Sequence, residues 1–459
     1  MRTLRIVLVA AIVLGAAVAS ARAQTAPNLS AIRLLLPMST LLNTPAGRAA
    51  LKSNLEVTGA IQAGTAPQPT LEPPAAQREQ ALVDATITSE NALQLADGLG
   101  STLGGAYRSL ASYASTDGGK TVQATNVARS VELLLRYTIG LTFADSGSTK
   151  NFFGNETLVS QGHAAPVSAQ AAALLASAGG TTDVFGKAYG RPAGSPGADP
   201  NGDSRPFQTE PSLFTYSGTD YFGTPASNTD FLRGPLQRLV ENPSFPSGHT
   251  TYGYTDSLLL ALLVPARYPQ MIVRAAEYGN DRIVIGAHYA MDVLGGRTLA
   301  YYDLAHALAE DPAYVGQTFR GFTISAYGKA LAAARADLTR ALEARCGRPI
   351  AACAAADTSR FRDDAADGAF YESTQTYGLA VVHPALANVR EDVATLAPEA
   401  ATLLTAAFPS LTAADADRIL TETEGPGGGF LDDGSRFGVY SRLDLYAAAK
   451  RAAQLVAQR

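Results

Sequence analysis

Three consecutive helix-like stretches constrain the fold of this chain more than any other feature. They cover Thr250–Val264, Pro269–Tyr278 and about Tyr289–Ala309, and each carries the apolar spacing of a helix that packs on a core. No clean alternation of apolar and polar residues, which would indicate a half-buried strand, is evident in the sequence. We therefore predict an all-α helical bundle.

Further stretches extend this prediction to both sides. Apolar residues recur at three- and four-residue intervals in Gln80–Ala96, Leu103–Ala114 and Thr121–Thr138. Thr323–Arg345 is predicted to be an amphipathic helix that begins with Thr323 as its N-cap. Asp183–Tyr221 is rich in Gly, Pro, Ser and Asp, and a loop of that length is usually functional or disordered.

The N-terminus has the features of a secretory signal peptide. Two arginines precede an apolar run from Ile6 to about Ala19, and Ala21-Arg22-Ala23 is a small-x-small cleavage site. The alternative is a membrane anchor, but the run is shorter than the roughly 20 residues that span a bilayer. We expect a periplasmic or secreted protein cleaved near Ala23, with a net charge of (36 − 3) − 41 = −8. An acidic chain without a basic run argues against nucleic acid as a partner.

The rest of the chain holds no apolar segment long enough to insert stably into a membrane. The best candidate, Leu258–Val264, has seven residues and ends at Pro265. The only two cysteines, Cys346 and Cys353, enclose six residues. In an exported protein we expect them to form a local disulfide, and a metal site is disfavoured because no histidine or third cysteine lies nearby.

Two segments combine residue types that suit anion chemistry. His288 and Asp292 are four residues apart, so on one helix they would lie on the same face, where the carboxylate can fix the imidazole tautomer. Arg282 lies upstream of a turn expected at Gly286, and a guanidinium can bind two phosphate oxygens at once.

The other segment is Pro246-Ser247-Gly248-His249, just before the helix that starts near Thr250. A Ser-Gly turn at a helix N-terminus offers backbone N–H groups and a hydroxyl to an anion, and His249 could protonate a leaving oxygen. Either histidine alone would more often be a cap or surface residue. Together they indicate an oxyanion site with two imidazoles.

These residues resemble the motifs of the type 2 phosphatidic acid phosphatase family, which includes bacterial class A acid phosphatases and vanadium-dependent haloperoxidases. That family has three motifs: Lys, six residues, then Arg-Pro; Pro-Ser-Gly-His; and Ser-Arg, five residues, His, three residues, Asp. Pro246–His249 matches the second motif in full, and Arg282, His288 and Asp292 match the spacing of the third. Asp281 stands where the third motif has Ser.

The first motif is not contiguous. Lys187 begins KAYGRP, but the expected Arg-Pro occurs only at Arg205-Pro206, 18 residues after Lys187. We interpret roughly Pro192–Ser204 as an insertion within the motif. Arg191 competes for the arginine role, and Arg205 is favoured because Phe207 follows its proline, as is common in secreted members.

The resemblance implies a fold, a reaction and a set of roles. The fold is the helical bundle of the acid phosphatases and haloperoxidases, with irregular loops and a mostly helical C-terminal extension. His288 would attack phosphorus and form a phosphohistidine, Asp292 would hold its other nitrogen, and His249 would act as general acid and base. The phosphoryl oxygens would be held by Lys187, Arg205, Ser247, Gly248 and Arg282. We expect neither a metal nor another cofactor, since the sequence has no Asp/His cluster spaced for two metals.

On this reading the chain divides into a signal peptide at 1–23, an N-terminal segment with a Pro/Ala-rich connector at 24–79, a catalytic helical domain at 80–345, and an extension at 346–459 packed on it.

We predict an exported phosphatase that hydrolyses small-molecule phosphomonoesters. One alternative is a vanadium-dependent haloperoxidase, in which the same residues would bind vanadate as cofactor. Thr250, where the haloperoxidases tend to have alanine, and the run GAHYAMDV favour the phosphatase. The second alternative is a non-catalytic exported binding protein. Oligomeric state is left open.

Overall fold

The computed structural model describes residues 41–66, 69–86, 92–117, 120–153, 203–210, 213–240 and 242–459. Within these ranges the chain is mainly helical, and its strands form three two-stranded sheets. The all-α prediction is confirmed. The predicted signal peptide, Lys187, Arg191 and most of the predicted insertion lie outside the described residues.

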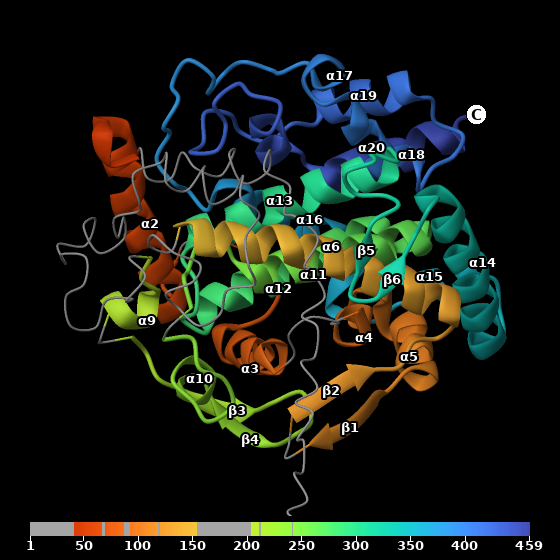
Figure 1. The fold of residues 1–459 in the computed structure, drawn as a ribbon, viewed down its shortest axis with the longest axis horizontal. Coiled ribbons are helices and arrows are strands. Elements are labelled where there is room, and N and C mark those ends of the chain that lie inside the picture. Colours follow the sequence, from red (N-terminus) through yellow and green to blue (C-terminus); the bar gives the residue numbers. More distant parts are fainter. Residues whose placement is uncertain are drawn as a thin grey trace, which may run out of the picture.

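Four long helices form the centre of the molecule (Figure 1). They are α6 (Arg129–Phe153), α11 (Gly248–Leu263), α12 (Tyr268–Val284) and α13 (Ala290–Leu308). Every residue of α11 is buried, polar and apolar alike, because this helix lies inside the bundle. The sequence predicted α11 and α13 almost to the residue.

Helix α12 is longer than predicted, because Gly279 does not end it. A Cβ atom at Gly279 would lie 3.0 Å from Val293 Cγ1 and 3.3 Å from Thr250 Cγ2. The glycine therefore serves the close approach of α12 to α11 and α13. The extra turn carries Arg282 to the end of the helix, where Gly286 (φ 89°) makes the expected turn.

The N-terminal part of the described chain supports the start of α13. It comprises α2 (Pro45–Ala63), α3 (Pro74–Ala85), α4 (Ala92–Leu95), η2 (Ala96–Leu99) and α5 (Gly100–Leu110). Asn54 Oδ1 and Thr58 Oγ1 on α2 accept hydrogen bonds from the N–H groups of Met291 (3.0 Å) and Ala290 (3.2 Å). These N–H groups have no acceptor within their own helix. Helix α2 therefore caps α13, a role that the sequence did not reveal.

The described residues include three short hairpins, and two of them replace parts of predicted helices. They pair β1 (Tyr113–Asp117) with β2 (Lys120–Ala124), β3 (Ser217–Thr219) with β4 (Pro225–Ser227), and β5 (Thr318–Phe319) with β6 (Phe322–Thr323). The predicted helix Thr121–Thr138 is wrong at its start, because the Asp-Gly-Gly sequence before Lys120 favours a hairpin. Thr323 is likewise no N-cap; it pairs with Thr318, and the next helix begins at Tyr327.

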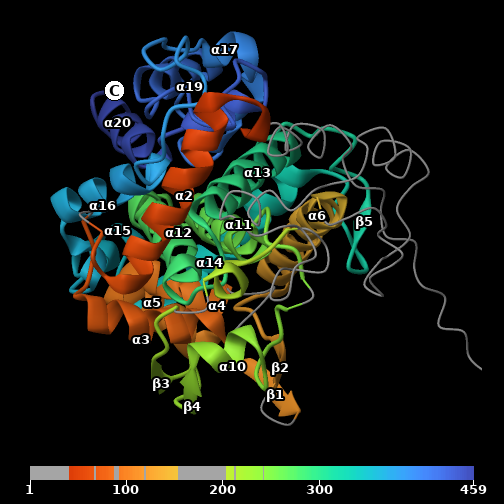
Figure 2. The ribbon, with the colours of Figure 1, turned by 90° about the vertical axis from the view of Figure 1, so that its left-hand side faces the viewer.

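The remaining elements surround the bundle. Before α11 lie α9 (Pro206–Thr209) and α10 (Asn228–Leu232), and after it η3 (Pro265–Arg267). The C-terminal part contains α14 (Tyr327–Cys346), α15 (Ile350–Ala355), η4 (Arg360–Arg362), α16 (Asp364–Thr376), α17 (Val393–Leu396), η5 (Pro398–Ala401), α18 (Thr402–Thr405), α19 (Ala413–Glu422), η6 (Gly438–Arg442) and α20 (Leu445–Ala457). In Figures 1 and 2 the elements from α17 to α20 lie together at one end of the molecule, against α13.

Polar and ionic contacts join residues 346–459 to the bundle. Arg297 on α13 donates to the carbonyls of Thr374, Gln375 and Ser441 at 3.0–3.1 Å. Arg360 forms an ion pair with Glu277 of α12 at 2.6 Å. A single hydrophobic cluster runs from α2 to α20, so the extension shares the core of the bundle.

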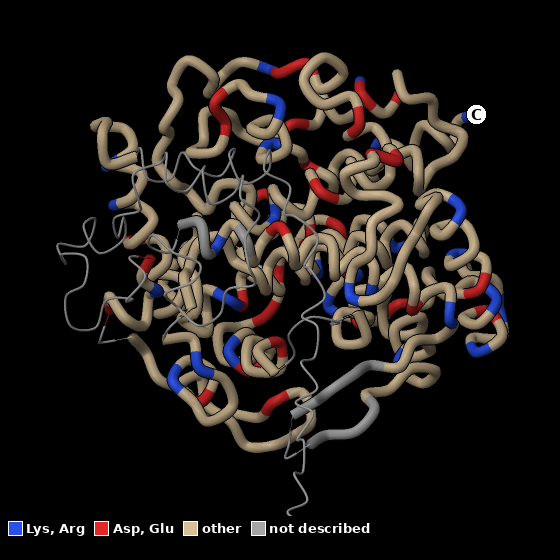
Figure 3. The backbone as a smooth tube through the Cα atoms, viewed as in Figure 1, with Lys and Arg blue, Asp and Glu red and all other residues tan. Residues whose placement is uncertain are grey.

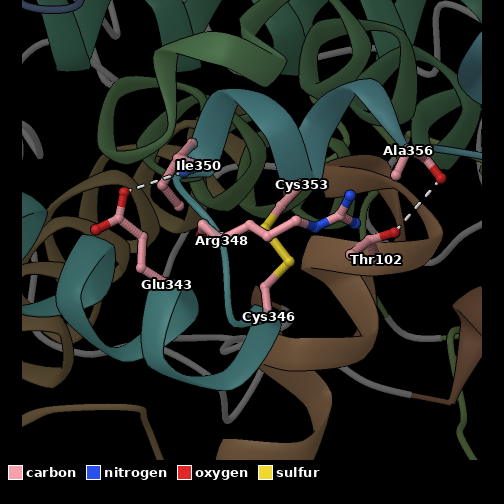
Figure 4. The surroundings of a disulfide bond; sticks show 7 residues. All are labelled: Thr102, Glu343, Cys346, Arg348, Ile350, Cys353 and Ala356. Carbon is pink, nitrogen blue, oxygen red and sulfur yellow. Dashed lines mark hydrogen bonds between the residues drawn. A yellow bond between two sulfur atoms is a disulfide. The ribbon is translucent and has the colours of Figure 1, made fainter.

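The predicted disulfide is present. It joins Cys346, at the end of α14, to Cys353 in α15, with the Cα atoms 6.5 Å apart (Figure 4). Around it, the Ile350 N–H donates to Glu343 Oε1 at 3.0 Å, and Thr102 of α5 donates to the Ala356 carbonyl at 3.5 Å. The bridge fixes the turn between α14 and α15 beside α5.

In the view of Figure 3, acidic and basic residues are interspersed along the described backbone. Among the helices described, none combines the length and the apolar character needed to cross a membrane.

Candidate active site

His288 and Asp292 form the centre of the predicted site. Both are fully buried, and His288 Nδ1 lies 3.1 Å from Asp292 Oδ2. The prediction that the pair shares one face of a helix is wrong. His288 precedes the N-cap residue Tyr289, and α13 begins only at Ala290. Asp292 is the third residue of α13 and reaches back, accepting the Tyr289 N–H at 2.9 Å. The helix start itself brings the carboxylate to the imidazole.

A further hydrogen bond fixes the same carboxylate. The hydroxyl of Ser244 donates to Asp292 Oδ2, and the Ser247 N–H donates to the Asp292 carbonyl at 2.9 Å. The loop before α11 is therefore held directly against the start of α13. No sequence motif indicated that Ser244 takes part.

Arg205 contacts the other ring nitrogen of His288. Its Nη1 lies 3.1 Å from His288 Nε2 and also donates to the Ala287 carbonyl at 2.9 Å. Arginine has no acceptor atom, so Nε2 must accept and cannot carry a proton in this arrangement. The proton of a neutral His288 then lies on Nδ1, facing Asp292. In this tautomer the electron pair lies on Nε2, the form in which an imidazole can act as a nucleophile.

The loop between α10 and α11 holds Arg205 in place. Asn242 accepts from Arg205 Nε through its carbonyl (2.7 Å) and from Nη2 through Oδ1 (2.8 Å), and the Pro243 carbonyl accepts from Nη2 (2.8 Å). Asp203 also binds this loop, because its Oδ2 accepts a hydrogen bond from the Phe245 N–H at 2.8 Å. The residues around Arg205-Pro206 are therefore joined to the segment that leads into the Ser-Gly turn.

Arg282 is the most unusual group in the site. It is fully buried on the last turn of α12, and none of its three guanidinium nitrogens has a hydrogen-bond partner within the described ranges. Burial lowers its pKa, although the guanidinium stays charged at any ordinary pH. A buried, unpaired cation is costly, so this position is suited to an anion.

The Ser247–Gly248 turn forms the N-terminus of α11, as predicted. Ser247 is the N-cap, and its Oγ accepts from the Thr250 N–H (3.1 Å) and the Thr250 hydroxyl (2.8 Å). Its own N–H is used by Asp292, so Ser247 can offer an anion only its hydroxyl proton. The first-turn N–H groups at Gly248 and His249 have no acceptor within the helix.

His249 lies in the first turn of α11 and is 9% exposed. Its Nε2 has no hydrogen-bond partner in the part of the chain that the structure describes. Burial lowers its pKa well below the ordinary value, and the charges of Arg282, Arg205 and Lys150 lower it further. An anion among these cations would reverse that effect and favour the protonated ring.

Lys150 is a site residue that the sequence did not single out. Near the end of α6, its Nζ donates to the carbonyls of Pro243 (2.6 Å) and Ser244 (2.9 Å). A Cβ atom at Gly248 would lie 3.4 Å from Lys150 Cε. The lysine thus lies beside the Ser-Gly turn. More than 50 residues separate it from Arg205 in the sequence, so no short spacing pointed to it.

Charge and burial set the protonation of the central pair. Burial lowers the pKa of His288 well below its ordinary value, and the charges of Arg205 and Lys150 lower it further. Burial raises the pKa of Asp292 to about 6, against the opposing hydrogen bonds from Ser244 and Tyr289. Above about pH 6 the pair is therefore a carboxylate beside a neutral imidazole.

Asp281, the departure from the third motif, belongs to a different environment. It is fully buried, and its pKa is raised well above the ordinary value, first by burial and then by the carboxylates of Asp84 and Glu277. Those carboxylates surround Arg274, to which they lie at 2.6 Å and 3.2 Å. Asp281 is thus placed with the buried ion-pair network of α12 and not with the two histidines.

The chain is similar in part to known acid phosphatases. A family model described as "PAP2 superfamily" matches residues 169–309. The chain is 42% identical over 67 residues to an acid phosphatase of Zymomonas mobilis, covering 15% of this chain and 25% of that protein. It is 35% identical over 100 residues to a non-specific acid phosphatase of Salmonella typhimurium (22% and 34%), and 26% identical over 134 residues to one of Providencia stuartii (27% and 52%). The chain thus spans about a quarter to half of the length of these relatives.

Proposed function

Because residues 169–309 belong to the PAP2 superfamily, we propose that this protein is an exported phosphatase that hydrolyses small-molecule phosphomonoesters through a phosphohistidine. The observation that carries the proposal is the buried guanidinium of Arg282, which has no partner among the described residues. It lies at the end of α12, six residues before His288. A phosphoryl group bound there would neutralise the cation and stand in front of the nucleophile.

The first step is transfer to His288. Its Nε2 forms a bond to phosphorus while the bond from phosphorus to the ester oxygen breaks, and His249 gives its proton to the departing oxygen. Arg205 donates to Nε2 in the free protein. It would exchange this bond for one to a phosphoryl oxygen, which frees the electron pair for attack. Asp292 accepts the Nδ1–H and stabilises the charge that the ring gains.

The second step releases phosphate. Water attacks phosphorus, the bond from phosphorus to Nε2 breaks, and His249 takes the proton of the water. Phosphoryl transfer depends mainly on positioning and charge stabilisation. Arg205, Arg282 and Lys150, with the hydroxyl of Ser247 and the backbone at Gly248, provide that stabilisation in a buried site where charges act strongly. Lys187 is proposed to contribute as well, on the resemblance alone.

The residue set also argues for a reaction without a metal. Lys150, Arg205 and Arg282 surround the two histidines with positive charge, which disfavours a divalent cation at the same place. Vanadate, an anion of the same shape as phosphate, would suit these residues. We expect it to act as an inhibitor of phosphate transfer.

Export is the second part of the proposal. The disulfide between Cys346 and Cys353 is of a kind that persists in oxidising compartments, and the first 23 residues have the features of a signal peptide. We propose that residues 80–345 are the catalytic domain and that 346–459 steady it through Arg297 and Arg360. N-terminal sequencing of the exported protein should begin near Gln24.

Turnover of p-nitrophenyl phosphate tests the activity. We expect hydrolysis that survives EDTA, is blocked by vanadate, and is lost in His288→Ala while the variant stays folded. Halide oxidation with added vanadate, in the absence of phosphate-ester hydrolysis, would favour a haloperoxidase. Binding of phosphate esters without turnover would favour a binding protein.

A further inference from the structure

A cavity of about 130 Å³ lies between α13 and the C-terminal extension, apart from the two histidines. Leu294, Leu379, Val381 and Phe430 line it with apolar surface, and Arg297 and Gln375 contribute polar groups. Val381 is 43% exposed, so the cavity can be reached from solvent on that side. Its size is comparable to that of engineered cavities that bind benzene.

The polar groups of this cavity have unused hydrogen-bonding capacity. Gln375 is 5% exposed, and neither its Nε2 nor its Oε1 has a partner among the described residues. Arg297 is 2% exposed and donates through Nη1 and Nη2 to three carbonyls, while its Nε has no partner there. Such groups are normally satisfied in folded proteins. Two such side chains lining one cavity make it a candidate ligand site.

Charge specifies the kind of ligand. Over the described ranges, no carboxylate oxygen lies within 4.0 Å of Arg297, whereas the buried Arg274 and the partly buried Arg360 each pair with two or more carboxylates. Burial acts most strongly on the pKa of Arg297 and lowers it, whereas the phenols of Tyr254, Tyr371 and Tyr301 raise it, and the net change is upward. Burial raises the pKa of Asp444 and the charge of Arg297 opposes that rise, so this carboxylate acts on Arg297 from beyond ion-pair distance. A buried guanidinium whose described hydrogen-bond partners are carbonyls is complementary to a carboxylate, which can also accept from an amide N–H.

We propose that this cavity binds a small amphipathic carboxylate. Its carboxylate would accept from Arg297 and Gln375, and its apolar body would pack on Leu294, Leu379 and Phe430. The inference does not depend on the proposed phosphatase activity. The site is nevertheless close to the catalytic loop, because the Phe430 ring is 6.3 Å from that of Phe245, the residue before Pro246.

Calorimetric titration of the full chain with sodium benzoate tests the proposal, with benzamide as the neutral ligand of the same shape. Saturating sulfate is kept in the solution so that it occupies the cationic side chains of the candidate active site, Lys150, Arg205 and Arg282. We expect benzoate to bind with one-to-one stoichiometry and at least about tenfold more tightly than benzamide, as charge-assisted hydrogen bonds imply. The absence of saturable binding up to about 10 mM, a range in which a weak ligand is still measurable, or equal affinity for benzamide, would overturn the proposal.

Two variants locate the site. Gln375→Leu removes only groups that have no partner in the described structure, so it should leave the fold stable and weaken benzoate binding about tenfold or more. Gly429→Leu should also abolish binding, because Gly429 lines the cavity and a Cβ there meets no atom within 4 Å. The matched control is Gln62→Leu, a glutamine that is also 5% exposed but lies on α2. Unchanged affinity in Gln375→Leu and Gly429→Leu, or an equal loss in the control, would contradict the assignment.

Discussion

The two buried arginines of α12 should respond to the same substitution with opposite changes in stability. Arg274 and Arg282 are both fully buried. Arg274 lies 2.6 Å from Asp84 and 2.8 Å from Asp97, whereas Arg282 has no partner in the described part of the chain. Methionine keeps much of the side-chain volume and removes the charge in either case.

Arg274→Met should destabilise the protein, because it leaves carboxylates buried without their cation. Loss of one partner of a buried pair costs about 3–5 kcal/mol. Arg282→Met should stabilise the free protein by on the order of 1–3 kcal/mol, since it removes an uncompensated buried charge. An unfolding entropy of about 2.1 cal/mol/K per residue over 459 residues gives about 1 kcal/mol/K, so each kcal/mol shifts Tm by about 1 °C.

The activities should change in the other order. Arg282→Met is expected to lower kcat/KM by about 10³–10⁵, the range for an arginine that stabilises a transferring phosphoryl group. Sulfate should raise the Tm of the unmodified protein and fail to raise that of Arg282→Met. Calorimetry and p-nitrophenyl phosphate kinetics on both variants measure these effects. The reasoning is refuted if Arg282→Met is destabilised as much as Arg274→Met, or if it keeps near-normal activity.

Three further predictions follow from the site and the fold. Lys150→Met should lower kcat/KM by about 10²–10³, as loss of one charge-stabilising donor does, whereas Lys52→Met on the exposed side of α2 should change it little in the same kinetic assay. Sulfate affinity should fall as pH rises, because bound sulfate raises the lowered pKa of His249, and the ring takes up a proton on binding. Titration calorimetry across about pH 5 to 8 measures this effect on both sides of the ordinary histidine pKa. A pH-independent affinity would contradict the coupling. Replacing Cys346 and Cys353 by serine removes the disulfide, so the unfolded chain is no longer restricted by a closed loop. For a loop of this length, the free energy of unfolding measured in urea should fall by at most about 2.5 kcal/mol. Loss of folding altogether would show that the bridge does more than restrict the unfolded chain.

The helices that carry the site could be predicted because their signals are local. The apolar spacing of α11 and α13, the glycine turn at Gly286 and the Ser-Gly helix start are all visible within a few residues. The contact between His288 and Asp292 was predicted with an incorrect geometry. Helix periodicity suggested a shared face, whereas the capping of α13 brings the two residues together.

The groups that complete the site come from distant segments. Lys150 donates to backbone carbonyls, Asn242 accepts through its carbonyl and its Oδ1, and Ser244 donates through its hydroxyl. Such contacts leave no spacing in a sequence. Helix α2 was missed because its role is to cap α13 through Asn54 and Thr58, two polar residues on its buried side. Long-range hydrogen bonds of this kind depend on the fold and have no periodic pattern.

Trapping the covalent intermediate tests the central claim most directly. Phosphorus-labelled substrate is mixed with the protein for a few milliseconds and quenched in alkali, which preserves a phosphorus–nitrogen bond, and the labelled peptide is sequenced. We expect one phosphoryl group on Nε2 of His288, absent in His288→Ala and accumulating in a variant with His249 replaced. Turnover without a labelled histidine, or a label at another residue, would contradict it.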